Sequence, residues 1–123
     1  MPNEQAHLRQ AEHNSKFLIE IGKCDTANKF NDWQVVVMFY IILHRVDSII
    51  DKLIQCSPHG HEARMKYVAR LIQFSSIREE YFNLYRFSIY ARYECGKVAI
   101  DYEKVRSLYT YLLTSIDSIQ QAI

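Results

Sequence analysis

The chain has 123 residues, with fifteen basic and fourteen acidic side chains and a formal net charge of +1. This length fits one domain of ordinary size, and the balanced charge excludes a global attraction to nucleic acid or to an anionic membrane. Three cysteines without a Cys-x-x-Cys pair favour reduced thiols in a cytoplasmic protein. The first ten residues are too polar for a signal peptide, and the apolar run 35–43 is too short to cross a membrane.

Helix breakers are scarce, and this predicts a protein built of helices. Only three glycines and two prolines occur in the chain, which favours long helices over many short strands. No internal repeat or linker divides the sequence, so we predict one all-α domain over residues 1–123. Short connections favour an antiparallel bundle of four to five helices. The expected helices cover residues 4–21, 31–55, 61–72, 77–93 and 101–121.

The first two helices differ in their apolar patterns. In the first, the apolar positions are loosely spaced, and they are His7, Ala11, Leu18 and Ile21. Gly22 is the expected stop. The second helix is expected to start at the N-cap residues Asn31 and Asp32. Because residues 33–43 are apolar almost all round, we expect this helix at the centre of the bundle.

The last three helices have an apolar face at helical spacing. The third follows the turn at 57–60, and its face consists of Met65, Val68 and Ile72. The fourth follows Ser75 and Ser76, and its stripe consists of Ile77, Tyr81, Leu84, Ser88 and Ala91. After a break expected at 94–97, Asp101 caps the last helix. The apolar positions of that helix are Tyr102, Val105, Leu108, Leu112, Ile116 and Ile119.

A polar stripe interrupts the apolar second helix. It consists of His44, Asp47, Ser48 and Asp51, which share one face. Two carboxylates one turn apart repel each other unless a cation lies nearby, and Arg64 and Arg92 are the best candidates. We therefore predict that His44, Asp47, Arg64 and Arg92 converge, with His61, in a polar pocket. Three interpretations stay open at this point: a solvent boundary, a structural ion-pair network, and a functional pocket.

The fourth helix combines arginines with aromatic side chains. Arginines can contact phosphates while tyrosines stack on bases, so this helix offers a candidate nucleic-acid or dimer face. The face consists of Arg78, Tyr85, Arg86 and Tyr93. The alternative is a row of core aromatics with arginines that extend to solvent.

Motifs for cofactor or nucleophile chemistry are missing from the sequence. The His59-Gly60-His61 segment offers two imidazoles, but the paired Glu-x-x-His pattern of metal sites in helical bundles does not occur. Neither a Gly-x-Ser-x-Gly elbow nor a glycine-rich phosphate loop is present. We therefore expect no metal and no cofactor.

A series of short motifs extends over nearly the whole chain, from about residue 11 to 119. In order, these motifs are Asp32-Trp33, Phe39-Tyr40, Leu43-His44, Val46-Asp47, His61, Arg64, Ser88 and Ala91-Arg92-Tyr93. Their order resembles that of bacterial and archaeal HEPN-domain proteins. The resemblance implies an all-α bundle of four to five helices that commonly dimerises.

The resemblance also implies an RNA-related role. Known activities in the family are mostly metal-independent RNA cleavage, often in toxin–antitoxin or defence systems, and other members are non-catalytic RNA-binding or scaffold domains. The family's catalytic Arg is followed four to six residues later by His, and here residues 93–98 after Arg92 contain none. The polar set that matches is His44, Asp47, His61, Arg64 and Arg92, and no catalytic pair carries over.

Two functions are therefore expected. The first is a non-catalytic HEPN-like module that binds RNA or a protein, and the resemblance points to a nucleotidyltransferase-like protein as one partner. The alternative is a metal-independent ribonuclease that uses a rearranged set, His44 or His61 with Arg92. In either case we expect a homodimer, because sixteen aromatic side chains are more than a small core easily holds.

Overall fold

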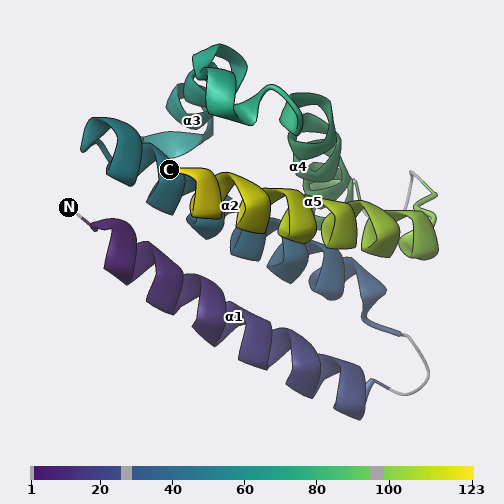
Figure 1. The fold of residues 1–123 in the computed structure, drawn as a ribbon. Coiled ribbons are helices and arrows are strands. Elements are labelled where there is room, and N and C mark those ends of the chain that lie inside the picture. The colour runs from purple at the N-terminus through teal and green to yellow at the C-terminus, as the bar shows by residue number, and fades with distance from the viewer. Residues whose placement is uncertain (1, 26–28, 95–98) are drawn as a thin grey trace.

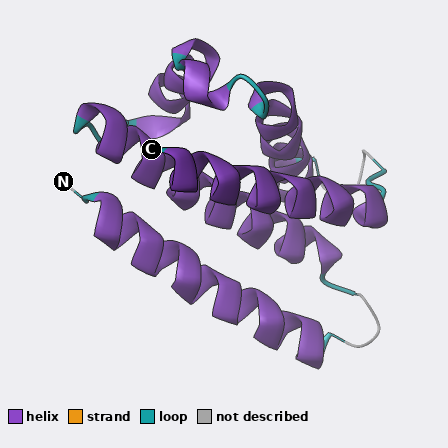
Figure 2. Ribbon diagram, viewed as in Figure 1, coloured by secondary structure: helices purple, strands orange, loops and turns teal. Residues whose placement is uncertain are grey.

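The chain folds into α-helices, as Figures 1 and 2 show. The computed structural model describes residues 2–25, 29–94 and 99–123, and no strand occurs in these ranges. The elements are α1 (Glu4–Cys24), α2 (Asn31–Ile54), α3 (Gly60–Arg70), the 3-10 helix η1 (Ile72–Phe74), α4 (Arg78–Tyr93) and α5 (Tyr102–Ala122). The prediction of an all-α bundle is confirmed, and the break expected at 94–97 lies mostly outside the described residues.

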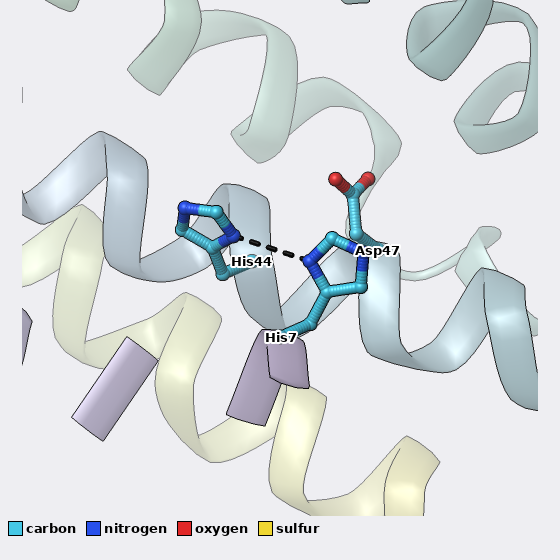
Figure 3. Close-up of side chains that lie close together, drawn as sticks. All are labelled: His7, His44 and Asp47. Atoms are coloured by element: carbon cyan, nitrogen blue, oxygen red, sulfur yellow. Dashed lines mark hydrogen bonds between the residues drawn. The ribbon is translucent and has the colours of Figure 1, made fainter. Parts of the chain in front are cut away.

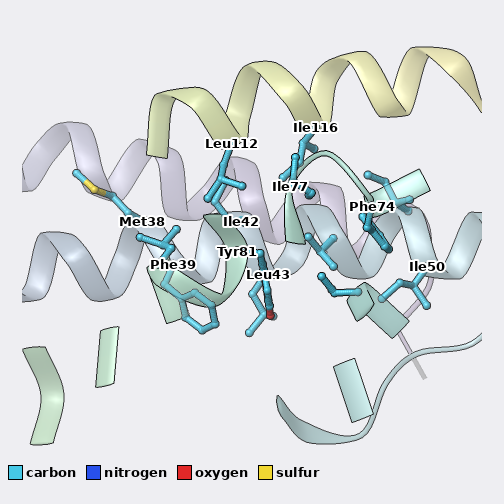
Figure 4. Packing of buried hydrophobic residues seen from close by; sticks show 14 of the residues in the cluster. Met38, Phe39, Ile42, Leu43, Ile50, Phe74, Ile77, Tyr81, Leu112 and Ile116 are labelled. Carbon is cyan, nitrogen blue, oxygen red and sulfur yellow. The ribbon is translucent and has the colours of Figure 1, made fainter. Parts of the chain in front are cut away.

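Helix α2 is the centre of the fold. It packs against α1, α4 and α5, and its side chains form much of the core shown in Figure 4. Its fully buried side chains include Phe39, Ile42, Val46, Ile49 and Ile50. By length and composition alone α2 is apolar enough to cross a membrane, but most of that stretch is buried among the other helices. It therefore has the character expected of a core helix.

Helix α1 packs antiparallel on α2 and forms a hairpin with it (Figure 1). His7 and Ala11 face the interior, as their spacing predicts. The expected stop at Gly22 is wrong, because the helix continues to Cys24. A glycine inside a helix costs only about 1 kcal/mol relative to alanine, too little to end a helix whose next turn forms its hydrogen bonds.

Asp25 organises the connection between α1 and α2. Its carboxylate accepts hydrogen bonds from the backbone N–H groups of Lys29 (2.8 Å) and Phe30 (2.7 Å). The predicted N-cap at Asn31 and Asp32 is wrong, because the helix already includes both residues and no side chain caps it. Asn31 instead accepts from the Arg106 guanidinium at 3.1 Å and so links α2 to α5.

Arg78 closes the end of α3. The helix stops at Arg70 because Leu71 is extended, so the predicted end at residue 72 is wrong. Ile72 is 78% exposed and does not join the apolar face predicted for it. The Arg78 guanidinium donates to the carbonyls of Val68 and Leu71, both at 2.8 Å. The bond to Val68 satisfies one of the carbonyls that a helix end leaves without partners, and the Leu71 carbonyl also accepts from the Phe74 N–H.

Helices α4 and α5 follow their predicted patterns. On α4, Tyr81, Leu84 and Ser88 are buried, and on α5 Val105, Leu112 and Ile116 are buried. The carboxylate of Asp101 caps α5 by accepting from the Lys104 N–H, which confirms the predicted cap. Arg45 ties α2 to α5 through Asp117 (2.5 Å) and Gln120 (2.9 Å).

Candidate functional site

The polar stripe of α2 connects this helix to three others. Each side chain of the stripe contacts a different group: His44 the His7 ring, Asp47 the Arg64 guanidinium, Ser48 the Gln120 amide, and Asp51 the backbone N–H of Glu4. Asp51 therefore lies at the N-terminus of α1, where the helix dipole favours a negative charge. The two carboxylates do not share one cation, because each has its own partner.

Asp47 and Arg64 form a buried ion pair between α2 and α3. Arg64 donates through Nε at 2.6 Å and through Nη2 at 3.0 Å, one bond to each carboxylate oxygen. Asp47 is 2% exposed and Arg64 6%. Burial alone lowers the pKa of Arg64, but its hydrogen bonds and attraction to Asp47 outweigh this, and the pKa is raised. Two hydrogen bonds hold both groups in place, so the pair fixes α3 against α2.

His44 faces a histidine that sequence reasoning did not assign to the site. The Nδ1 atoms of His7 and His44 lie 3.2 Å apart (Figure 3), and His7 Nε2 lies 3.3 Å from the Ser57 hydroxyl. Burial and the nearby His7 lower the pKa of His44, with Asp47 acting in the opposite direction. The sequence placed His7 on the apolar stripe of the first helix, where a histidine gives no sign of its partner.

His61 lies between the buried pair and the surface. Its Nδ1 is 3.4 Å from Arg64 Nη1, and its ring packs on those of Tyr85 (4.9 Å between centroids) and Phe39 (5.8 Å). Burial lowers the pKa of His61, and the positive charges of Arg64 and Arg92 lower it further. Because Arg64 faces Nδ1 with a donor, the neutral ring carries its proton on Nε2.

Arg92 joins this region from the last turn of α4. Its Nη1 donates to the Tyr40 hydroxyl at 3.0 Å and its Nε to the Ser88 carbonyl at 3.4 Å. The guanidinium carbon lies 5.6 Å from the centre of the Tyr40 ring and 5.0 Å from that of Tyr93, within cation–π distance. Arg92 makes no hydrogen bond to Asp47 and reaches His61 by way of Tyr40, whose ring is 6.4 Å from His61.

The predicted site residues therefore separate into two groups. The interior group is His44, Asp47 and Arg64, with His7 added. The outer group, which we name the Arg92 patch, consists of Tyr40, His61, Arg92 and Tyr93. His61 contacts both groups, through Arg64 on one side and the Tyr40 ring on the other.

The predicted face on α4 does not form one surface. Arg78 is engaged by the carbonyls at the end of α3, and Tyr85 packs inward against His61. Arg86 is exposed and contacts Asn83 at 3.5 Å. Tyr93, at the other end of the helix from Arg78, is exposed and belongs to the Arg92 patch.

The two shifted histidines predict a loss of stability in mild acid. The pKa of His44 and that of His61 are both lowered in the folded state from the ordinary value of 6.5. Below about pH 6.5 the unfolded chain therefore binds more protons than the folded one, so the free energy of unfolding falls as the pH drops toward the folded pKa values. Urea unfolding with a chelator present, between about pH 7.5 and pH 5, measures this fall.

A matched set of variants assigns the acid sensitivity. The His44→Gln/His61→Gln variant is expected to lose much of the pH dependence, whereas His13→Gln, at an exposed position on α1, is expected to keep it. An unchanged slope in the double variant would contradict the assignment.

Comparison with protein-family models, with curated proteins and with solved structures finds no match for this chain.

Proposed function

We propose that the protein is a HEPN-like, non-catalytic module of the cytoplasm that binds single-stranded RNA at the Arg92 patch. The observation that carries this proposal is the position of the Arg92 guanidinium, between the rings of Tyr40 and Tyr93. Among the described residues, no carboxylate lies within ion-pair distance of Arg92. Its charge is therefore available to an anion.

The composition of the patch favours RNA as that anion. Single-stranded nucleic acids bind where cations meet the phosphates and aromatic rings stack on the bases. Tyr93 is 65% exposed and lies against Arg92, so both kinds of group are present side by side. The net charge of +1 does not oppose this proposal, because the local charge of Arg92 attracts phosphate within about a Debye length of 8–10 Å.

The state of the histidines supports binding rather than cleavage. A general base needs a free nitrogen lone pair within reach of the substrate. Arg64 faces the Nδ1 lone pair of His61, and His44 is turned to His7 in the interior. His61 can instead donate a hydrogen bond through Nε2–H to a phosphate oxygen.

We further propose a homodimer, but with a different face from the one the sequence indicated. The aromatics of α4 are mostly buried or half-buried. Large exposed apolar side chains gather instead around one pocket where α1 meets α2, and they are Phe17, Phe30 and Trp33. An exposed cluster of this kind often marks an interface between proteins.

Fluorescence anisotropy with a labelled single-stranded RNA tests the binding proposal. The Arg92→Ala and Tyr93→Ala variants are each expected to weaken binding by about 1–3 kcal/mol, and Arg92→Ala also lowers the salt slope by about one unit. Arg92→Lys is expected to recover the salt slope but not the full affinity, because lysine lacks the planar guanidinium that stacks on the rings. Arg9→Ala, at an exposed position on α1, is the matched control and should bind like the wild type.

The same samples separate the alternatives. Cleavage of the labelled RNA that depends on His61 or His44 would favour the ribonuclease reading. Equal binding by wild type and Arg92→Ala would remove the patch as the site, and an absence of RNA binding would leave a protein partner as the better explanation. Sedimentation equilibrium of the same protein shows whether it is the proposed dimer or a monomer of 14.6 kDa.

A further inference from the structure

Three side chains with metal-binding atoms lie together where the N-terminal turns of α1 pack on α2. They are His7, His44 and Asp47, and one ligand atom from each lies within 4.8 Å of the others (Figure 3). His7 comes from α1, whereas His44 and Asp47 come from successive turns of α2. Asp47 and His7 are buried and His44 is half-buried, so the cluster is largely shielded from bulk water.

We propose that His7, His44 and Asp47 bind a divalent transition-metal ion of the Zn²⁺ type, which fastens α1 to α2. This proposal is independent of RNA binding at the Arg92 patch. It rests on the spacing of the two imidazoles, on the contact of the Ser57 hydroxyl with the other nitrogen of His7, and on the nearby carboxylate of Asp47.

The spacing of the imidazoles fits a shared ion. Two nitrogens on one tetrahedral Zn²⁺, each about 2.0–2.1 Å from the metal, lie about 3.3 Å apart. The Nδ1 atoms of His7 and His44 are 3.2 Å apart. Without a metal, one of these nitrogens must carry a proton to make a hydrogen bond to the other. A metal ion bound to both Nδ1 atoms takes the place of that proton, which moves to Nε2 of the same neutral ring, so no net release of protons is required.

The second nitrogen of His7 is already engaged. Ser57 Oγ lies 3.3 Å from His7 Nε2, and a hydroxyl can accept from Nε2–H, the tautomer that leaves the Nδ1 lone pair for an ion. Metal-bound histidines are usually oriented in this way by a group on their other nitrogen. Ser57 is therefore a positioning residue for the site.

Asp47 supplies the negative charge. Its oxygens accept hydrogen bonds from Arg64, but a carboxylate has about four lone-pair sites, so it keeps acceptor capacity for an ion. Arg64 weakens the attraction for a cation and at the same time orients the carboxylate. Two imidazoles with one carboxylate suit Zn²⁺, Cu²⁺ or Ni²⁺ rather than Ca²⁺ or Mg²⁺, which prefer oxygen ligands.

Titration of tag-free, chelator-treated protein with ZnCl₂ tests this proposal. Calorimetry is expected to show one Zn²⁺ per chain, and the melting temperature is expected to rise with Zn²⁺ but not with MgCl₂. His7→Gln and His44→Gln should abolish both effects, and Ser57→Ala should weaken Zn²⁺ binding about tenfold. His13→Gln, on the same helix as His7, and His59→Gln are the matched controls and should bind as the wild type does.

A measurement on the wild type covers the case in which a variant fails to fold. In nitrogen NMR spectra of the imidazoles, Zn²⁺ should shift the signals of His7 and His44 and leave those of His13 and His59 in place. Zn²⁺ binding that persists in His7→Gln, shifts confined to His13 or His59, or an absence of binding at stoichiometric Zn²⁺ would each overturn the site.

Discussion

Replacing Asp47 with alanine is expected to lower the free energy of unfolding by about 3–5 kcal/mol. The change removes the only hydrogen-bonded carboxylate partner of Arg64 among the described residues and leaves a guanidinium that is 6% exposed. Because the Arg64 side chain is buried, water has little access to take the place of the lost carboxylate. The cost of removing the guanidinium from water is then no longer offset. Urea unfolding at pH 7.5 with a chelator present measures the loss.

Two controls separate the buried charge from the loss of a contact. The Asp47→Leu/Arg64→Met double variant is expected to regain most of the lost stability, because it removes both charges and keeps apolar volume. Glu12→Ala breaks an ion pair with Lys16 in which both side chains are at least 70% exposed, and its effect should stay within about 1 kcal/mol. If Asp47→Ala were no more harmful than Glu12→Ala, the pair would not be essential to the fold.

Periodicity was sufficient to predict the helices because burial in a helix repeats every three or four residues. The stripe on α4 and the pattern on α5 follow this rule, and Asp101 caps α5 through a contact only three residues away. One error is local, because Gly22 costs too little stability to end α1. Another lies where the contact is longer: α3 ends at Arg70, and Arg78 bonds to the carbonyls of Val68 and Leu71.

The sequence predicted the candidate site only where a buried charge needed a partner of opposite charge. Asp47, buried on an apolar helix, required a cation, and Arg64 provides it. The same reasoning predicted that Arg92 lies near Asp47. The Arg92 guanidinium instead donates to the Tyr40 hydroxyl and the Ser88 carbonyl. Both acceptors are uncharged, so a search for opposite charges in the sequence does not find them.

Two contacts of the polar stripe could not be predicted from the sequence. His7 is 37 residues from His44 and occupies a position that an apolar residue could also fill. Asp51 accepts a hydrogen bond from the backbone N–H of Glu4, a group that every residue except proline has. Only the packing of α1 on α2 selects these two contacts.

Phe39→Ala is the second change for which we expect a large effect, a loss of about 3–5 kcal/mol in the free energy of unfolding. Phe39 is fully buried on α2, and its ring packs against Tyr81 at 5.8 Å and Tyr85 at 5.3 Å between centroids. Alanine would leave a cavity between α2 and α4, and a close-packed core relaxes only partly around such a gap. Urea unfolding measures the loss.

The matched control is Phe17→Ala on α1, which removes the same atoms from a side chain that is 55% exposed. Its effect on the monomer should stay near 0.5 kcal/mol. Because Phe17 lies in the proposed dimer face, any further loss should depend on protein concentration. Phe39 also supports His61, whose ring lies 5.8 Å away. At a urea concentration where the variant is still folded, Phe39→Ala should therefore weaken RNA binding at the Arg92 patch, whereas Phe17→Ala should not. Equal RNA affinity for the two folded variants would show that the core does not position His61 for the ligand.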